Sequence, residues 1–219
     1  MRKKLIPFKK IIFLESKIKQ SNVFEKMNSK KKIFNSKLID KGFYDGSLKS
    51  VDFFKIKNKN LEIGLGKTSF FDMLFLKEIG KKLSPSLAVN AIIEVEGHII
   101  FIRRDENVYS SGNKIDFPAG LVPKDKTPLK RLKNRIKEDL GLEESKIVLE
   151  RLIPCAIDTD DCSFNLFFKM NYKGNKKEIE DFFEKNFETK KPFLVKKDKI
   201  STFFKKNDKP IFFEILKYI

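Results

Sequence analysis

The chain contains few of the residues that build metal centres and nucleophilic catalytic sites. Its 219 residues include one histidine, His98, two cysteines, Cys155 and Cys162, and no tryptophan. Two cysteines at this separation form neither a zinc site nor a disulfide framework, which fits a reducing cytoplasm. A nucleophile paired with histidine would have to use His98, and nothing in the sequence places either cysteine beside it. We therefore expect a cytoplasmic protein without a thiol nucleophile.

Long hydrophobic runs are also missing. The apolar run that follows the basic N-terminus, residues 11–14, is far shorter than the roughly 7–15 residues of a signal-peptide core. No stretch approaches the roughly 20 apolar residues that a membrane-spanning helix needs. We therefore expect a protein that is neither exported nor integral to a membrane.

Positive charge is what the sequence has in excess. Lys and Arg number 47 against 30 for Asp and Glu, which gives a net charge of +17. Such a charge attracts polyanions, nucleotides or an anionic membrane surface. A composition rich in lysine, with 23 phenylalanines, is also what an AT-rich genome produces, and we favour that interpretation over nucleic-acid binding.

Length and composition favour one folded domain with an extension. Hydrophobic residues make up 41% of the chain and charged residues 35%, as expected for a packed core under a charged surface. Residues 1–60 alternate short apolar clusters with lysine-rich stretches, and we interpret them as a basic N-terminal extension packed on the domain. Residues 61–219 carry clearer periodicities and are interpreted as the domain itself.

Turn and capping residues mark the clearest elements. Strands at 87–95 and 98–103 are joined by a tight turn at Glu96-Gly97. The clearest helix begins after Thr127, has Pro128 in its first position, and ends at Gly141. The other expected elements are a helix at 69–83, strands at 147–157 and 163–172, a helix at 178–187, and short helices at 200–204 and 210–219. This arrangement predicts an α+β fold of mixed layers.

The helix that follows Thr127 has two distinct faces. An apolar stripe at helical spacing is formed by Leu129, Leu132, Ile136 and Leu140. Arg135, Glu138 and Asp139 are three and four residues apart, so they share the neighbouring face. Two adjacent carboxylates on a rigid helix suit a hard divalent cation. A second interpretation is that Arg135 neutralises both carboxylates and takes the place of the metal.

The stretch from residue 120 to residue 142 resembles the Nudix box, G-x5-E-x7-R-E-U-x-E-E-x-G-U, in which U is aliphatic. The matching positions are Gly120, Ile136, Glu138, Asp139 (Asp for Glu), Gly141 and Leu142. The positions that depart from the box are Lys126, Asn134 and Arg135. Active members of the family have a metal-binding glutamate where this chain has Arg135. A weaker resemblance, over about residues 61–170, is to the Nudix branch that cleaves UDP-glucose and UDP-galactose.

The resemblance implies a fold, a chemistry and a set of site residues. The fold would be Nudix-like, with a mixed sheet sandwiched between helices. The chemistry would be cleavage, with Mg²⁺ or Mn²⁺, of the diphosphate in a nucleoside diphosphate linked to another group, for which a nucleotide sugar such as UDP-glucose is the first choice. Glu138 and Asp139 would be catalytic and would hold the metal. The substrate-binding residues would be Arg103 and Arg104 at the phosphates, Phe117 lining the approach, and Gly120.

Arg135 leaves two functions open. In the first, the chain is a metal-dependent hydrolase in which another acid replaces the missing glutamate. The candidates for that acid are Asp125, Asp158, Asp160 and Asp161. In the second, the chain is a catalytically inactive Nudix-fold module that binds a nucleotide or nucleic acid through its positive charge. Glu138 and Asp139 favour the first function, whereas Arg135 favours the second.

Overall fold

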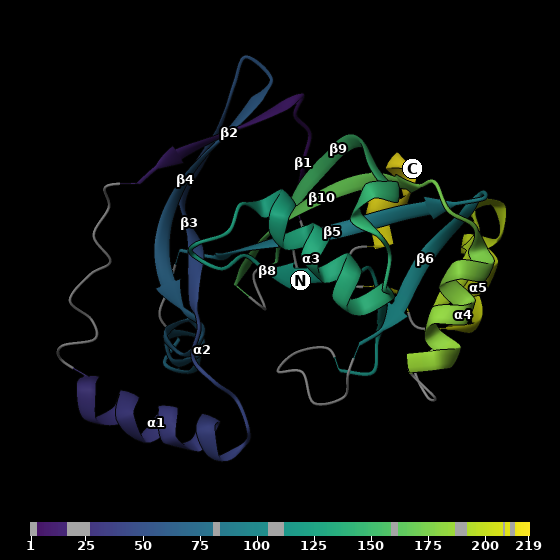
Figure 1. The fold of residues 1–219 in the computed structure, drawn as a ribbon. Coiled ribbons are helices and arrows are strands. Elements are labelled where there is room, and N and C mark those ends of the chain that lie inside the picture. Colours follow the sequence, from purple (N-terminus) through teal and green to yellow (C-terminus); the bar gives the residue numbers. More distant parts are fainter. Residues whose placement is uncertain are drawn as a thin grey trace.

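Strand pairing joins segments from both ends of the chain into one mixed sheet (Figure 1). The computed structural model describes residues 4–16, 27–80, 84–104, 112–158, 162–186, 192–207, 209–210 and 213–219. Within these residues the sheet has 11 strands. No helix in the same residues is long and apolar enough to cross a membrane.

The elements have the following bounds. The strands are β1 (Lys4–Ile6), β2 (Lys10–Glu15), β3 (Ser47–Lys57), β4 (Asn60–Ser69), β5 (Ser86–Val95), β6 (His98–Arg103), β7 (Ile115–Asp116), β8 (Ala119–Leu121), β9 (Ile147–Asp158), β10 (Ser163–Tyr172) and β11 (Phe193–Lys196). The α-helices are α1 (Asn28–Asp40), α2 (Phe70–Glu78), α3 (Pro128–Leu140), α4 (Lys176–Asn186) and α5 (Ile200–Lys206). The short 3-10 helices in the described residues are η2 (Glu144–Lys146), η3 (Lys197–Lys199) and η4 (Phe213–Tyr218).

The N-terminal segment supplies both end strands and one interior strand of the main sheet path. The main path runs β1-β9-β10-β5-β3-β4-β2, and β6 joins β5 to β7 and β11. β10 is parallel to β5 and β2 is parallel to β4, whereas the other paired strands are antiparallel. Residues 1–60, expected as an extension packed on the domain, therefore supply three strands, β1, β2 and β3, to the common sheet.

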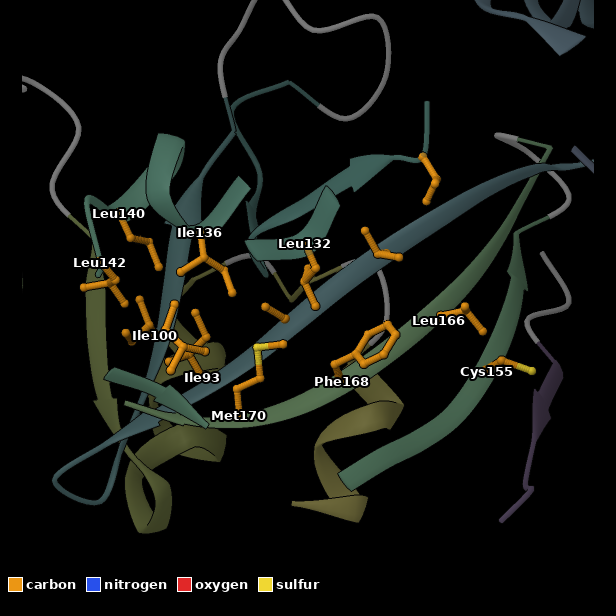
Figure 2. Packing of buried hydrophobic residues seen from close by; sticks show 14 of the residues in the cluster. Ile93, Ile100, Leu132, Ile136, Leu140, Leu142, Cys155, Leu166, Phe168 and Met170 are labelled. Atoms are coloured by element: carbon orange, nitrogen blue, oxygen red, sulfur yellow. The ribbon is translucent and has the colours of Figure 1, made fainter. Parts of the chain in front are cut away.

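One face of the sheet packs against α3 and α4. Side chains alternate between the two faces of a strand, so every second residue of β5 points toward these helices. The buried β5 residues on this face are Leu87, Val89, Ala91, Ile93 and Val95. The apolar stripe of α3 covers them: Leu132, Ile136 and Leu140 are fully buried, and Ile136 and Leu140 lie above Ile93 and Ile100 (Figure 2). α4 adds its own buried residues to the same cluster.

The opposite face packs against the C-terminal helices. Ile92, Ile99 and Phe167 point to this side and form a second core cluster with Phe204 of α5 and Ile215 of η4. The sheet therefore lies between helices on both faces. This arrangement confirms the expected α+β fold class with a mixed sheet sandwiched between helices.

The capping residues place α3 where the sequence predicts it. The hydroxyl of Thr127 accepts a hydrogen bond from the Lys130 N–H at 3.3 Å, and Pro128 is the first helical residue. Gly141 ends the helix with a φ of +64°, and the ring of Phe182 from α4 occupies the space where a Cβ would lie. The turn at Glu96-Gly97 is also confirmed, with φ values of +46° and +72°.

The other expected elements agree in type, with shifted ends. The helix expected at 69–83 spans Phe70–Glu78, and residues 81–83 lie outside the described part. The helix expected at 178–187 begins two residues earlier, at Lys176. The expected helix at 210–219 is the 3-10 helix η4, and residues 211–212 lie outside the described part. The strand expected at 163–172 has those bounds.

Gly141 tests the junction between α3 and α4. We expect Gly141→Ala to lower the free energy of unfolding by about 2–3 kcal/mol, because positive φ costs a Cβ-bearing residue about 1–2 kcal/mol and Phe182 must also move. Gly42→Ala should lower the free energy of unfolding only by the cost of the positive φ, about 1–2 kcal/mol. Its φ is +80°, and no atom lies within 4 Å of the added Cβ. Gly46→Ala, with open space and no positive φ, is the neutral control. Urea unfolding of the three variants measures the free energy of unfolding of each. Equal losses for Gly42→Ala and Gly141→Ala would contradict the expected contribution of Phe182.

Candidate active site on helix α3

Arg135 lies against both carboxylates of the box-like segment. Its Nη1 is 3.0 Å from Glu138 Oε2, and its Nη2 is 2.6 Å from Asp139 Oδ1. Its Nε donates to the main-chain carbonyl of Ala119 at 3.2 Å. The guanidinium therefore joins the polar face of α3 to β8 through three directed contacts. Charge-assisted hydrogen bonds of this kind are stronger than bonds between neutral groups.

A second arginine, Arg131, completes the same cluster. It lies one turn before Arg135, and its Nη1 is 3.6 Å from Glu138 Oε2. Its Nε donates to the carbonyl of Leu121 at 3.1 Å. The sequence analysis did not single out Arg131, although its spacing of four residues from Arg135 places both on one helix face and was a usable signal.

Gly120 lies beneath these two arginines. A Cβ at this position would be 2.9 Å from Cγ of Arg135 and 3.2 Å from Nε of Arg131. The side chains therefore pass close over the backbone of β8 because the glycine has no side chain. The glycine that the sequence resemblance assigns to the substrate site is covered by the arginines of α3.

Burial and charge act in opposite directions on Asp139. Its side chain is 14% exposed, and burial raises the pKa of its carboxyl from 3.8 to about 6, while the neighbouring Arg135 lowers it and Glu138 raises it further. Its Oδ2 is buried and has no hydrogen-bond partner among the described residues. Glu138 is different, since half of its side chain is exposed. Arg135 therefore provides the positive charge that the buried carboxylate requires.

The residues on this face do not fit a divalent cation in the observed arrangement. Mg²⁺ needs near-octahedral oxygen ligands, and each of the two carboxylates here already contacts a guanidinium. Within the described part of the chain, no group of three or more His, Cys, Asp or Glu side chains is placed to hold a metal ion. Two of the acids considered as replacements, Asp160 and Asp161, lie outside that part.

Two further departures from the Nudix box contact each other. When the amide of Asn134 is oriented to donate to the Lys130 carbonyl at 3.2 Å, its oxygen accepts a hydrogen bond from Nζ of Lys126 at 2.9 Å. Lys126 lies in the loop before α3, so this contact ties the loop to the helix. The side chains that depart from the box thus form their own set of contacts on α3.

Arg103 and Arg104 have their contacts on other elements. Arg103 donates to the carbonyl of Asn113 at 2.7 Å, and its guanidinium lies 5.5 Å from the centre of the Phe193 ring in β11. Arg104 lies 3.4 Å from the carboxylate of Asp116 in β7. The structure therefore brings Gly120, Glu138 and Asp139 together, while it places these two arginines at β7 and β11.

Phe117 lies in the core. Its side chain is 1% exposed, and its ring centre is 5.3 Å from that of Phe101 and 6.5 Å from that of Phe167. These contacts belong to the cluster on the sheet face opposite α3. A residue that lines the approach to a substrate site must reach solvent. The ring of Phe117 is instead enclosed by other aromatic side chains.

Comparison with known proteins gives one kind of match. No protein-family model and no curated protein sequence matches the chain. Solved structures do: a Nudix hydrolase from Nitrosomonas europaea is 14% identical, with a TM-score of 0.44 and 61% of this chain and 86% of that chain covered. The chain is similar to Nudix hydrolases of known structure. A MutT/Nudix family protein from Listeria innocua is 14% identical, with a TM-score of 0.41 and coverages of 52% and 80%.

An ADP-ribose pyrophosphatase from Streptococcus suis also matches. It is 19% identical, with a TM-score of 0.33 and coverages of 42% of this chain and 63% of that chain.

The raised pKa of Asp139 on α3 predicts that the stability of the folded protein depends on pH. A folded-state pKa of about 6, above the ordinary 3.8, means that the protonated carboxyl is favoured in the folded protein. Relative to Asp139→Asn, the wild type should be most stable below the ordinary pKa and should lose that advantage as the pH rises through the folded-state value. We expect a relative loss of roughly 1–3 kcal/mol, since one pKa unit corresponds to about 1.4 kcal/mol. Urea unfolding of both proteins at acidic and neutral pH measures it, and a difference that is independent of pH would contradict the expectation.

Proposed function

We propose that the chain is a Nudix-like module that binds a phosphate-bearing ligand, a nucleotide or a nucleic acid, without hydrolysing it. The observation that carries this proposal is the contact of Arg135 with both Glu138 and Asp139. A guanidinium supplies a fixed positive charge at this position, but it cannot coordinate a water molecule and lower its pKa as a divalent metal ion does. The two carboxylates are held as the counter-ions of an arginine pair.

The charge around α3 supports phosphate binding. Residues 124–140, the loop before α3 and the helix itself, contain seven Lys and Arg residues against three acids, Asp125, Glu138 and Asp139. Lys124, Lys130 and Lys137 are exposed in the structure, and Nζ of Lys130 lies 3.9 Å from the carboxylate of Glu144. A cluster of exposed cations neutralises the charge of phosphates and releases bound counter-ions, which makes the affinity depend strongly on salt.

A metal-dependent diphosphate hydrolase is the second candidate. It is favoured by the buried Oδ2 of Asp139, which lacks a hydrogen-bond partner in the described residues, and by the half-exposed Glu138 beside it. On this candidate Glu138 and Asp139 would hold Mg²⁺ or Mn²⁺, and the substrate would be a nucleotide sugar such as UDP-glucose. Arg103, Arg104, Phe117 and Gly120 keep their expected substrate roles only here. The candidate requires Arg135 to leave the carboxylates.

Turnover assays separate the two candidates. With Mg²⁺ or Mn²⁺, we expect wild type to leave a panel of nucleoside diphosphate sugars and ADP-ribose uncleaved. Arg135→Glu removes the guanidinium and adds a third carboxylate, so a gain of activity in this variant alone would identify a hydrolase centre that Arg135 blocks. Turnover by wild type that disappears in Glu138→Gln would instead establish the second candidate.

Salt titration tests the binding activity itself. Binding of a labelled single-stranded oligonucleotide should weaken steeply with NaCl, and Lys130→Glu with Lys137→Glu should reduce the slope of log affinity against log salt by about 1–2. Lys57→Glu with Lys67→Glu, on the exposed surface of β3 and β4, is the control with the same change in net charge. Fluorescence anisotropy measures both. Weak binding that is insensitive to salt, or equal effects of the two double variants, would contradict a phosphate-binding role for α3.

A further inference from the structure

A groove lies between β11 and α5, away from the α3 site. It has a volume of about 600 Å³ and follows β11 along its length, since residues 192–196 line it one after another. The other wall is one face of the segment that ends in α5, with Lys199, Phe203 and Lys206 three or four residues apart. Figure 1 places α5 at the end of the sheet opposite β3 and β4. The functional proposal above makes no use of this groove.

Among the residues that the structure describes, one edge of β11 beside the groove has no neighbouring strand. Within the described residues, β11 has one ladder partner, the antiparallel β6. The Lys197 N–H donates to the carbonyl of Gly97 at 3.1 Å. This hydrogen bond shows which residues of β11 direct their main-chain groups toward β6. In an antiparallel pair, alternate residues direct their N–H and C=O groups to the partner, and the residues between them direct theirs to the other side. Leu194 and Lys196 therefore present their main-chain groups at the outer edge of the sheet.

The side chains around the groove combine an apolar floor with a positive rim. Phe193 and Phe203 are partly buried, and their ring centres are 5.5 Å apart. The lining includes three lysines and no acidic side chain, with exposed ammonium-bearing residues at Lys196, Lys199 and Lys206. An occupant that fits these features is extended, carries negative charge, and has apolar side chains at intervals.

We propose that this groove binds an acidic peptide segment, which adds a strand to the free edge of β11. Strand addition uses the main-chain groups of Leu194 and Lys196, and alternate side chains of the peptide then point to opposite faces. Apolar side chains of the peptide lie on Phe193 and Phe203, while its carboxylates lie near the lysines of the rim. The groove thereby selects an extended peptide by backbone pairing and an acidic one by charge.

A peptide fits the groove better than a nucleic acid does. The planes of the Phe193 and Phe203 rings are inclined at 59°, and both rings are partly buried against the core, so they do not form a flat platform for stacked bases. The N–H and C=O groups along a strand edge are also spaced to match those of a second polypeptide strand. They are not spaced to match the phosphates of a nucleic acid. The groove is therefore suited to a peptide, and an oligonucleotide serves as the comparison ligand in the experiment.

The experiment uses the full chain and a short fluorescent peptide of alternating valine and glutamate. In fluorescence anisotropy, Lys199→Glu with Lys206→Glu should weaken binding of this peptide by about tenfold or more, since both ammonium groups become repulsive. Lys57→Glu with Lys67→Glu changes the net charge equally and should have little effect. A peptide N-methylated at alternate residues keeps its charge but loses backbone donors, and it should also bind about tenfold more weakly.

Three results would overturn the proposal. The first is an absence of saturable binding by the valine-glutamate peptide. The second is equal binding of the N-methylated peptide, which would mean that charge alone attracts the ligand without strand pairing. The third is loss of oligonucleotide binding in the Lys199/Lys206 variant with unchanged peptide binding, which would make the groove a nucleic-acid site. The first two results concern the peptide alone and say nothing about oligonucleotide binding at α3. In the third case, the effect of Lys130→Glu with Lys137→Glu on oligonucleotide binding is measured separately, so the failure of each proposal is distinguishable.

Discussion

The three-way contact of Arg135 with Glu138, Asp139 and the carbonyl of Ala119 is the constraint on which the candidate site depends. It fixes the helix to β8, neutralises two carboxylates, and fills the space above Gly120. A buried carboxylate is costly without a positive partner, and removal of one member of such a pair is more destabilising than the pair is stabilising. The arginine is therefore part of the packing of α3 as well as of its chemistry.

The hydrophobic core fixes the rotation of α3 and thereby holds Arg135 toward β8. Leu132, Ile136 and Leu140 are fully buried on the sheet, so the opposite rotation of α3, which would turn Arg135 away from β8, would expose them. Arg131, one turn earlier, donates to the other carbonyl that flanks Gly120. The buried face of the helix thus determines where its polar face lies. The proposal places ligand binding at the surrounding lysines, and not metal chemistry at the carboxylates that Arg135 contacts.

Local signals in the sequence were sufficient for α3 and its polar face. Thr127, Pro128 and Gly141 set the helix ends, and the spacing of Arg135, Glu138 and Asp139 predicted that they would meet. Pairing at long range could not be predicted from one sequence, because strand partners far apart in the chain leave no periodic signal. The pairing of β1 and β2 at the two ends of the main strand path, the position of β3 between β5 and β4, the burial of Phe117 and the contact of Arg103 with Phe193 all depend on such pairing.

The most direct test of the account is titration of the isotope-labelled protein with Mn²⁺, followed by NMR. Paramagnetic Mn²⁺ broadens the signals of nuclei close to it, so it reports a metal site without any need for turnover. The account predicts no selective broadening of amide signals from residues 131–139, since Arg135 holds both carboxylates. Selective, saturable broadening of these amides at low Mn²⁺ concentration would show that the metal displaces the guanidinium, and it would contradict the account.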